Sequence, residues 1–209
     1  MKHDTTYKAP LIGISRLRLG TDGNGITTLV AFSGCHLRCR YCLNSQCHSE
    51  VKIWKTPEEV MKVLQKDELY FWTTRGGVTF GGGEPLLHPQ FIRSVLEYGA
   101  KQWHVTIETS LNVSQESLEV LLPYVDEYII DVKDMDPLIY QKYTSMDNKL
   151  VKNNLRWLIA NGKKYNMLMR VPLINGFNNA DAQSRSIGEL STMGLTRFDR
   201  FEYKRTKYK

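Results

Sequence analysis

Three thiols lie close together near the start of this 209-residue chain. Cys35, Cys39 and Cys42 fall within eight residues and form the pattern Cys-x3-Cys-x2-Cys. Thiolates bind zinc and iron–sulfur clusters, so this spacing predicts one metal centre. Four cysteines would saturate the irons of a four-iron cluster, whereas three leave one iron open to a small molecule.

A second segment whose residue types could bind a ligand is Thr-Phe-Gly-Gly-Gly-Glu-Pro, from Thr79 to Pro85. Three consecutive glycines let the backbone approach a ligand closely or adopt positive φ. The same run is also typical of a tight turn between a strand and a helix. The residues alone leave both interpretations open.

The cysteine pattern resembles the cluster-binding loop of the radical S-adenosylmethionine (radical SAM) enzymes, and Tyr41 matches the aromatic residue before the third cysteine. The resemblance implies that the three thiols hold a 4Fe-4S cluster and that the methionine end of SAM binds the open iron. An electron from the reduced cluster would then cleave SAM to a 5'-deoxyadenosyl radical. The cofactors would carry the difficult chemistry.

The glycine run is similar to the GGE motif of the same family. By that resemblance, the backbone of Gly82 and Gly83 and the acid of Glu84 receive the amino end of SAM. Tyr41 joins them as a cofactor-binding residue.

Three further segments resemble the activating enzymes of glycyl radical enzymes, of the pyruvate formate-lyase activating type. They are the entry segment 22–26, segment 131–136, which is similar to a DLKxxD motif, and segment 170–176, which is similar to R-x-P-L-I-P-G. This resemblance implies further cofactor-binding residues, and some would bind a monovalent cation near the SAM carboxylate. Lys133 and Arg170 would help bind SAM, and the cation site would comprise Asp131, Glu108 and Thr109.

The same resemblance implies a glycyl radical enzyme as the protein substrate, from whose glycine a hydrogen atom is abstracted. It implies reduced flavodoxin or ferredoxin as the electron donor. An alternative is a radical SAM enzyme that acts on a small molecule, similar to 7-carboxy-7-deazaguanine synthase. An alternative of another class is a zinc-binding interaction module, in which Cys47 or His48 would supply a fourth ligand.

Other residues allow simpler interpretations. Asp131 and Lys133 share one side of a strand and could form an ion pair, and Arg170 could pair with a buried acid. Cys47 is expected to be an ordinary thiol, because a fourth thiolate would block the iron that SAM needs. The chain departs from the activating enzymes at Leu43, where they have histidine, at Glu108, where they have aspartate, and at Glu202-Tyr203-Lys204, where they have Pro-Tyr-His.

The elements that must position these residues alternate along the chain. The patterns of apolar residues, caps and glycines predict six strands and five helices. The predicted strands are 26–32, 77–80, 104–108, 127–132, 166–173 and 198–203, and the predicted helices begin at Pro57 or span 89–98, 114–122, 150–160 and 181–193.

This alternation predicts an α/β chain with parallel strands, in either an open doubly wound sheet or a barrel. The candidate site residues follow strand ends, which is the edge where barrel enzymes place their active sites. The radical SAM enzymes, which this chain resembles, have a six-stranded partial barrel. We therefore expect a partial (β/α)6 barrel.

The composition predicts one globular domain over residues 1–209, with 42% hydrophobic and 24% charged residues. The net charge of +6 comes from scattered residues without a nucleic-acid-binding motif, so no nucleic-acid partner is expected. No signal peptide or membrane span is expected, which predicts a cytoplasmic protein with reduced cysteines. The basic tail 204–209 is expected to be a solvated terminus.

Overall fold

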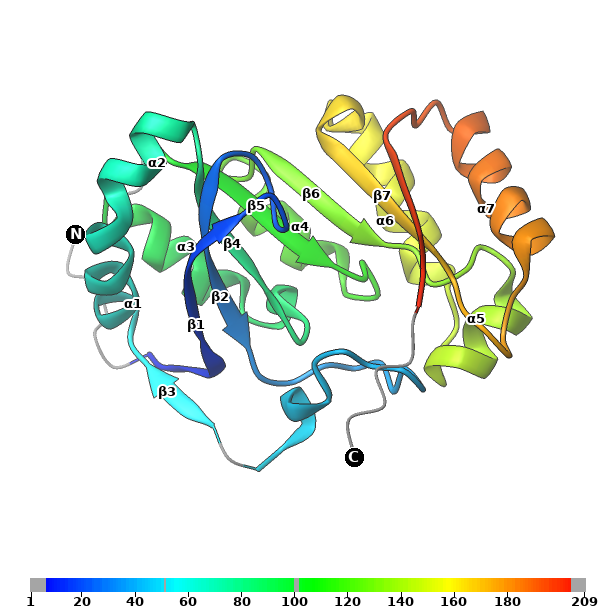
Figure 1. Ribbon diagram of the computed structural model, residues 1–209, viewed down its shortest axis with the longest axis horizontal. Coiled ribbons are helices and arrows are strands. Elements are labelled where there is room, and N and C mark those ends of the chain that lie inside the picture. The colour runs from blue at the N-terminus through cyan, green and yellow to red at the C-terminus, as the bar shows by residue number, and fades with distance from the viewer. Residues whose placement is uncertain (1–6, 51, 100–101, 204–209) are drawn as a thin grey trace. The chain divides into compact units, whose positions relative to one another are not determined.

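The computed structural model describes residues 7–50, 52–99 and 102–203 (Figure 1). Its strands are ordered β3-β1-β2-β4-β5-β6-β7-β8 in a mostly parallel open sheet. Lys204 and the basic tail lie outside the described residues. No helix in the described part of the chain is long and apolar enough to cross a membrane.

The strands and helices alternate through most of the chain (Figure 1). The strands are β1 Ala9–Leu19, β2 Ile26–Phe32, β3 Ile53–Lys55, β4 Gly77–Gly82, β5 His104–Thr109, β6 Glu127–Asp131, β7 Met167–Leu173 and β8 Phe198–Glu202. The α-helices are α1 Pro57–Leu64, α2 Glu68–Thr74, α3 Pro89–Glu97, α4 Gln115–Leu121, α5 Pro137–Thr144, α6 Lys149–Ala160 and α7 Ala180–Thr192. Short 3-10 helices are η1 Ser45–His48, η2 Gln65–Asp67, η3 Pro85–Leu87 and η4 Lys164–Asn166.

The chain divides into two compact units. The first comprises residues 1–35, 44–109 and 113–129, and the second comprises residues 36–43, 110–112 and 130–209. The prediction of one domain over the whole chain stays a prediction.

The first unit contains a sheet with parallel and antiparallel pairs. Strand β2 pairs with β4, and β4 with β5, in parallel, while β1 pairs antiparallel with both β2 and β3. The register places Phe32, the last residue of β2, opposite Gly82, the last residue of β4. This register brings the start of the cysteine pattern and the glycine run to the same strand ends.

The first unit has an apolar core, and a capping box stabilises the N-terminus of its first α-helix. The rings of Phe32, Phe80 and Phe91 are fully buried, and the Phe32 ring packs on the other two. At the N-terminus of α1, the Thr56 side chain accepts a hydrogen bond from the Glu59 amide and the Glu59 side chain accepts one from the Thr56 amide. This reciprocal capping box stabilises the first turn and confirms the predicted helix start.

The second unit contains the parallel pair β7 and β8 and the helices α5 to α7. Helix α5 begins at Pro137, where the Asp136 side chain accepts hydrogen bonds from the amides of Leu138 and Ile139. Such capping satisfies amides that have no partner inside the helix. The next acid back along the chain, Asp134, is buried and accepts hydrogen bonds from Ser186 and Asn178.

All six predicted strands and the predicted helices are present, with ends that differ by a few residues. The α/β class is therefore confirmed. Strands β1 and β3 and helices α2 and α5 were not predicted, and the two additional strands are antiparallel.

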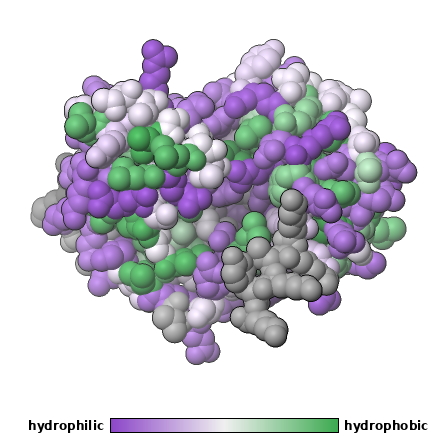
Figure 2. Space-filling model, in the orientation of Figure 1, coloured by the Kyte–Doolittle hydropathy of each residue, from purple (hydrophilic) through white to green (hydrophobic). Residues whose placement is uncertain are grey.

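The surface shows no large apolar area on the face in Figure 2, where hydrophobic side chains lie in small separate groups. Exposed large side chains include Leu69, Tyr70 and Trp72 of α2, and Ile53 and Trp54 of β3. Exposed apolar residues of this kind are ordinary on protein surfaces.

Candidate metal centre

The cysteine loop of the second unit, residues 36–43, is held by the end of helix α5. The Arg38 amide donates to the Thr144 carbonyl at 2.9 Å, and the Arg40 amide donates to the Tyr143 carbonyl at 3.1 Å. The last carbonyls of a helix have no partner within it, so they are available to bind such amides. The backbone on both sides of Cys39 is therefore fixed to α5.

The three thiols of the pattern are half-buried and outside any disulfide, whereas Cys47 is buried. Within the described residues, no three His, Cys, Asp or Glu side chains are grouped so that they could hold one metal ion. A structural zinc site needs its ligands around a single point. The thiolates of a cluster can each bind a different iron, and three partly accessible thiols outside any disulfide fit that group.

Cys39 lies in a charged environment within the second unit. Burial raises the pKa of its thiol, and the ammonium of Lys133 acts in the opposite direction. A metal-bound cysteine is deprotonated, and a nearby cation favours that charged form. Lys133 is therefore a suitable neighbour for an anionic thiolate centre.

Asp131 and Lys133 form the ion pair that the sequence left as an alternative. The Lys133 Nζ lies 2.8 Å from the Asp131 Oδ2 and 3.4 Å from the Tyr203 Oη, and only 7% of Lys133 is exposed. Burial disfavours the ammonium, but the attraction of Asp131, Tyr203 and Cys39 and the hydrogen bond to Asp131 together outweigh it and raise the pKa of Lys133. Lys133 is thus a buried cation held by a carboxylate.

Tyr41 belongs to an aromatic cluster in the second unit, formed by Tyr41, Tyr143, Phe177 and Tyr203. The Tyr41 ring meets the rings of Tyr143 and Phe177 nearly edge-on, at centroid distances of 6.2 Å and 5.5 Å. Tyr143 also packs against Phe177 at 5.2 Å and Tyr203 at 6.4 Å. These contacts fix the side chain that precedes Cys42.

The start of the cysteine pattern is held within the first unit. The Gly34 amide donates to the Cys47 carbonyl at 2.8 Å, and the Ser33 hydroxyl donates to the same carbonyl at 3.1 Å. Cys47 therefore supports the backbone next to Cys35 through its carbonyl, while its side chain is buried. The expectation that Cys47 is an ordinary thiol stays a prediction.

The glycines of the GGE segment are required by close backbone packing. A Cβ on Gly83 would lie 2.2 Å from the Gly34 carbonyl oxygen, and a Cβ on Gly82 would lie 2.9 Å from the Ala31 Cα. Gly82 also has a φ of +94°, which favours glycine. Both glycines therefore bring this segment against β2 and the residues before Cys35, and the Gly83 amide donates to the Phe32 carbonyl at 2.8 Å, which favours the turn interpretation.

Glu84 is brought together with another predicted site residue. Its Oε1 accepts a hydrogen bond from the Thr109 hydroxyl at 2.7 Å, and Glu84 is 1% exposed. Glu108 lies over Gly81, whose Cβ position is 2.9 Å from the Glu108 Oε2. In the first unit, these acids therefore line the ends of β4 and β5.

The other predicted site residues are Arg170 and those of the predicted cation site. The Arg170 Nε lies 3.6 Å from the Asp199 Oδ2, so this arginine has an acidic partner on β8. Glu108 and Thr109 belong to the first unit and Asp131 to the second, so the predicted cation site stays a prediction. Leu43, which departs from the pattern of the activating enzymes, is 69% exposed.

The sequence did not point to Tyr143 or Phe177 as site residues, although both pack on Tyr41. Neither belongs to one of the motifs. An aromatic residue near the end of a predicted helix would have been the available sign for Tyr143, but helix α5 was not predicted.

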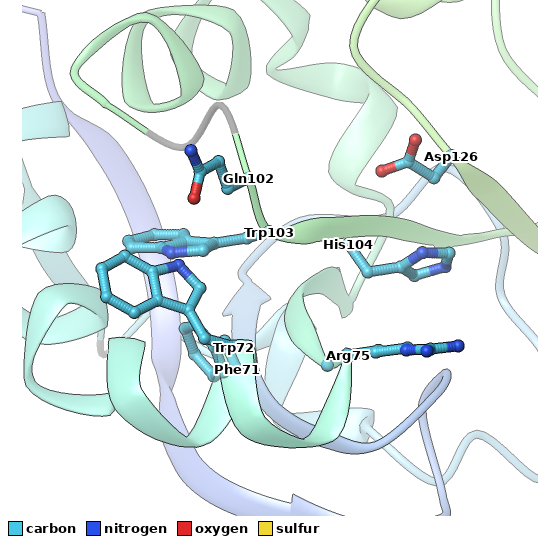
Figure 3. A pocket seen from close by; sticks show the side chains of 8 residues that line it. Phe71, Trp72, Arg75, Gln102, Trp103, His104 and Asp126 are labelled. Atoms are coloured by element: carbon cyan, nitrogen blue, oxygen red, sulfur yellow. The ribbon is translucent and has the colours of Figure 1, made fainter.

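A pocket of about 550 Å³ lies elsewhere in the first unit (Figure 3). The rings of Phe71 and Trp103 pack on one side at a centroid distance of 5.2 Å, and the side chains of Arg75 and His104 lie on the other. His104 begins β5, so the pocket is at the opposite end of these parallel strands from Gly82. It is therefore separate from the GGE segment.

Comparison with protein families identifies one match. The Radical SAM superfamily model matches residues 29–184, which include all three motif cysteines and the GGE segment.

Two curated relatives are activating enzymes. The chain is 37% identical over 127 residues to an indoleacetate decarboxylase activating enzyme from Tractidigestivibacter scatoligenes. This alignment covers 60% of this chain and 40% of the relative. It is 28% identical over 244 aligned positions to a choline trimethylamine-lyase activating enzyme from Oleidesulfovibrio alaskensis, covering 87% of this chain and 77% of the relative. The chain thus spans less than half of the first of these relatives.

A solved structure has a similar fold at low sequence identity. The Streptococcus suis SuiB structure bound to S-adenosylmethionine superposes with a TM-score of 0.65 and 16% identity, over 83% of this chain and 39% of SuiB. At this identity the likeness shows the fold alone. It agrees with the partial-barrel class predicted from the sequence.

Proposed function

The chain belongs to the radical SAM superfamily, and from this premise we propose that it binds a 4Fe-4S cluster and cleaves SAM to activate a glycyl radical enzyme. Cys35, Cys39 and Cys42 would hold the cluster. When bound, the cluster supplies one electron to SAM, which breaks into methionine and a 5'-deoxyadenosyl radical that takes a hydrogen atom from the substrate. Reduced flavodoxin or ferredoxin would supply the electron.

The observation that carries this proposal is the fixed cysteine loop. The two amide bonds from Arg38 and Arg40 to α5 hold the backbone around Cys39, and Lys133 provides a cation near its sulfur. A bound group benefits when its ligands are already positioned, because less ordering is needed on binding. Cysteines that are not in disulfides also suit a reducing, oxygen-poor cytoplasm.

The residues proposed to bind SAM have distinct tasks. Glu84, positioned by Thr109, would accept hydrogen bonds from the SAM ammonium group. Lys133, positioned by Asp131, would attract the SAM carboxylate, and Arg170 would assist. Tyr41, held in its aromatic cluster, would contact SAM from the cysteine loop. Opposite charges within a buried site interact strongly enough to orient a ligand.

The proposed substrate is the glycine of a partner protein. Support comes from the two relatives named above as activating enzymes and from the three segments that resemble this group. The chain spans only part of these relatives, so the substrate needs a direct test.

The cluster is tested by anaerobic reconstitution of the full chain with iron and sulfide. We expect about four irons per chain and a brown absorbing cluster. Cys35→Ala, Cys39→Ala and Cys42→Ala should each abolish SAM cleavage, whereas Cys47→Ala should retain it. Equal loss in the Cys47 variant would contradict the ligand assignment, and one zinc per chain would support the interaction module.

The substrate is tested with dithionite, SAM and candidate glycyl radical enzymes from the source cell. We expect 5'-deoxyadenosine and a doublet glycyl signal by electron paramagnetic resonance. A matched partner in which the radical glycine is replaced by alanine should give no such signal. Consumption of a small metabolite in step with SAM, without any glycyl signal, would overturn the activating role.

A further inference from the structure

The side chains of the cysteine loop alternate between the protein and the solvent. Residues 37, 39 and 41 are buried or half-buried, whereas His36, Arg38 and Arg40 between them are exposed. The Cys39 thiol, which lies between the two arginines in sequence, is half-buried. The loop therefore presents two cations to solvent on either side of a proposed cluster ligand.

A second segment of the same unit lies along this loop and adds positive charge. The Arg38 and Arg40 amides bind the end of α5, where Lys142 is exposed, and Lys149 is exposed at the start of α6. Residues 36–43 and 137–149 together carry four cations and one acid, Asp147, which is a net charge of +3 with histidine neutral. The surface around the loop is therefore positive.

Most of these cations have no acidic partner. Arg40, Lys142 and Lys149 form no ion pair among the described residues. An exposed lysine elsewhere can be neutralised by its neighbour, as on α1, where the Lys62 Nζ lies 2.8 Å from the Glu58 Oε1. Positive charge that is not neutralised produces a field that attracts an acidic partner.

Apolar groups accompany the charges. Leu43 is 69% exposed and Met146 is 40% exposed, and the Lys142 Nζ lies 5.7 Å from the centroid of the Phe177 ring. Protein interfaces combine apolar contacts with a polar rim, and electron-transfer complexes need only a small contact area. We call this area the cationic surface, and its members are Arg38, Arg40, Leu43, Lys142, Met146 and Lys149.

We propose that an electron-carrier protein with an acidic docking face binds the cationic surface and reduces the cluster from there. This inference rests on the cluster binding proposed above. One electron leaves the carrier, which is oxidised, and enters the cluster, which is reduced, and no bond forms or breaks in this step. A carrier is the partner that this position favours, because the surface belongs to the loop whose thiols would bind the irons.

The experiment measures reduction of the reconstituted full chain by a reduced flavodoxin and, separately, by a reduced ferredoxin, with anaerobic stopped-flow absorbance. Lys142→Glu/Lys149→Glu reverses two charges of the cationic surface. The matched control is Lys66→Glu/Arg75→Glu, because both residues are exposed, belong to the first unit and form no ion pair among the described residues. Iron content and SAM affinity are measured first in every protein.

The rate constant and its salt dependence are the readouts. The carrier that reduces the unmodified chain should reduce Lys142→Glu/Lys149→Glu at least about fivefold more slowly at low salt, whereas the control should keep the unmodified rate. The rate of the unmodified chain should itself fall as salt rises, because the screening length decreases to about 3 Å at 1 M. Lys142→Arg/Lys149→Arg retains both charges and should retain the rate.

Dithionite separates this inference from the proposed function, because a small reductant in excess needs no docking surface and should reduce every variant fully. Equal carrier rates in the Lys142→Glu/Lys149→Glu variant and its control, at normal iron content, would overturn this inference alone. A salt-independent carrier rate would do the same, as would an unmodified chain that dithionite reduces and neither carrier reduces. Failure of the unmodified chain to form a cluster would overturn the proposed function as well.

Discussion

The close approach of Gly83 to Gly34 predicts that Gly83→Ala destabilises the chain. The added methyl would lie 2.2 Å from the Gly34 carbonyl oxygen and 3.0 Å from that of Phe32. These are backbone atoms, so they cannot move aside as the end of a flexible side chain can. The segment must shift away from the residues before Cys35.

The expected cost follows from the contacts that this shift disturbs. The Gly83 amide donates to the Phe32 carbonyl and the Glu84 amide to the Gly34 carbonyl, both at 2.8 Å. Two such hydrogen bonds contribute about 1 kcal/mol each, and overpacking costs about 1 to 3 kcal/mol. Gly83→Ala should therefore lower the free energy of unfolding by about 3 to 5 kcal/mol.

The assay is urea denaturation of the apoprotein, together with iron content after reconstitution. Gly13→Ala is the matched control, because no atom lies within 4 Å of its Cβ position and the residue has no positive φ. Its free energy of unfolding should change by about 0.5 kcal/mol or less. The Gly83 variant should also bind less iron, because Gly34 precedes Cys35. Equal stability and equal iron content in the two variants would refute the packing argument.

Two other predictions concern charged groups. The pKa of Asp67 is lowered because hydrogen bonds from Arg16 and Thr28 outweigh its burial, so its contribution to stability should be present above the unfolded pKa of about 3.9 and be lost as pH falls through the lower folded value. Acid titration of unfolding should show a weaker pH dependence for Asp67→Asn than for the wild type below pH of about 4, and an unchanged dependence would contradict this assignment. Lys133→Met should raise the dissociation constant for SAM at least about tenfold by equilibrium dialysis, with unchanged iron content. Lys152→Met, which removes a more exposed lysine, is the control, and equal affinities in the two variants would argue against SAM binding by Lys133.

Much of the fold could be predicted because its strands are short apolar runs followed by glycines or caps. Strand β1 was not predicted because two irregularities in its register interrupt the alternation, and it carries Arg16 and Arg18. Helix α5 was missed for a similar reason, since Leu138 is 76% exposed while Tyr140 and Tyr143 are buried. Hydrophobic periodicity fails where an apolar residue faces solvent.

The candidate site was also predictable only in part. The cysteine and GGE motifs are local in sequence, so their residue types and spacing were sufficient to predict them. The surroundings of Tyr41 were not predictable, because Tyr143, Phe177 and Tyr203 come from distant parts of the chain. Sequence also could not decide what occupies the space beside Gly83, which is the backbone at Gly34.

The hydrogen bonds from the Arg38 and Arg40 amides to the end of α5 bear on when the cysteine loop can take its structure during synthesis. The loop leaves the ribosome long before residues 143 and 144 are made, and domains generally acquire structure as the chain emerges. The nascent loop must therefore wait for α5 before its backbone is locked. A short synthetic peptide with the three cysteines lacks these carbonyls, so it would present the thiols without the native geometry.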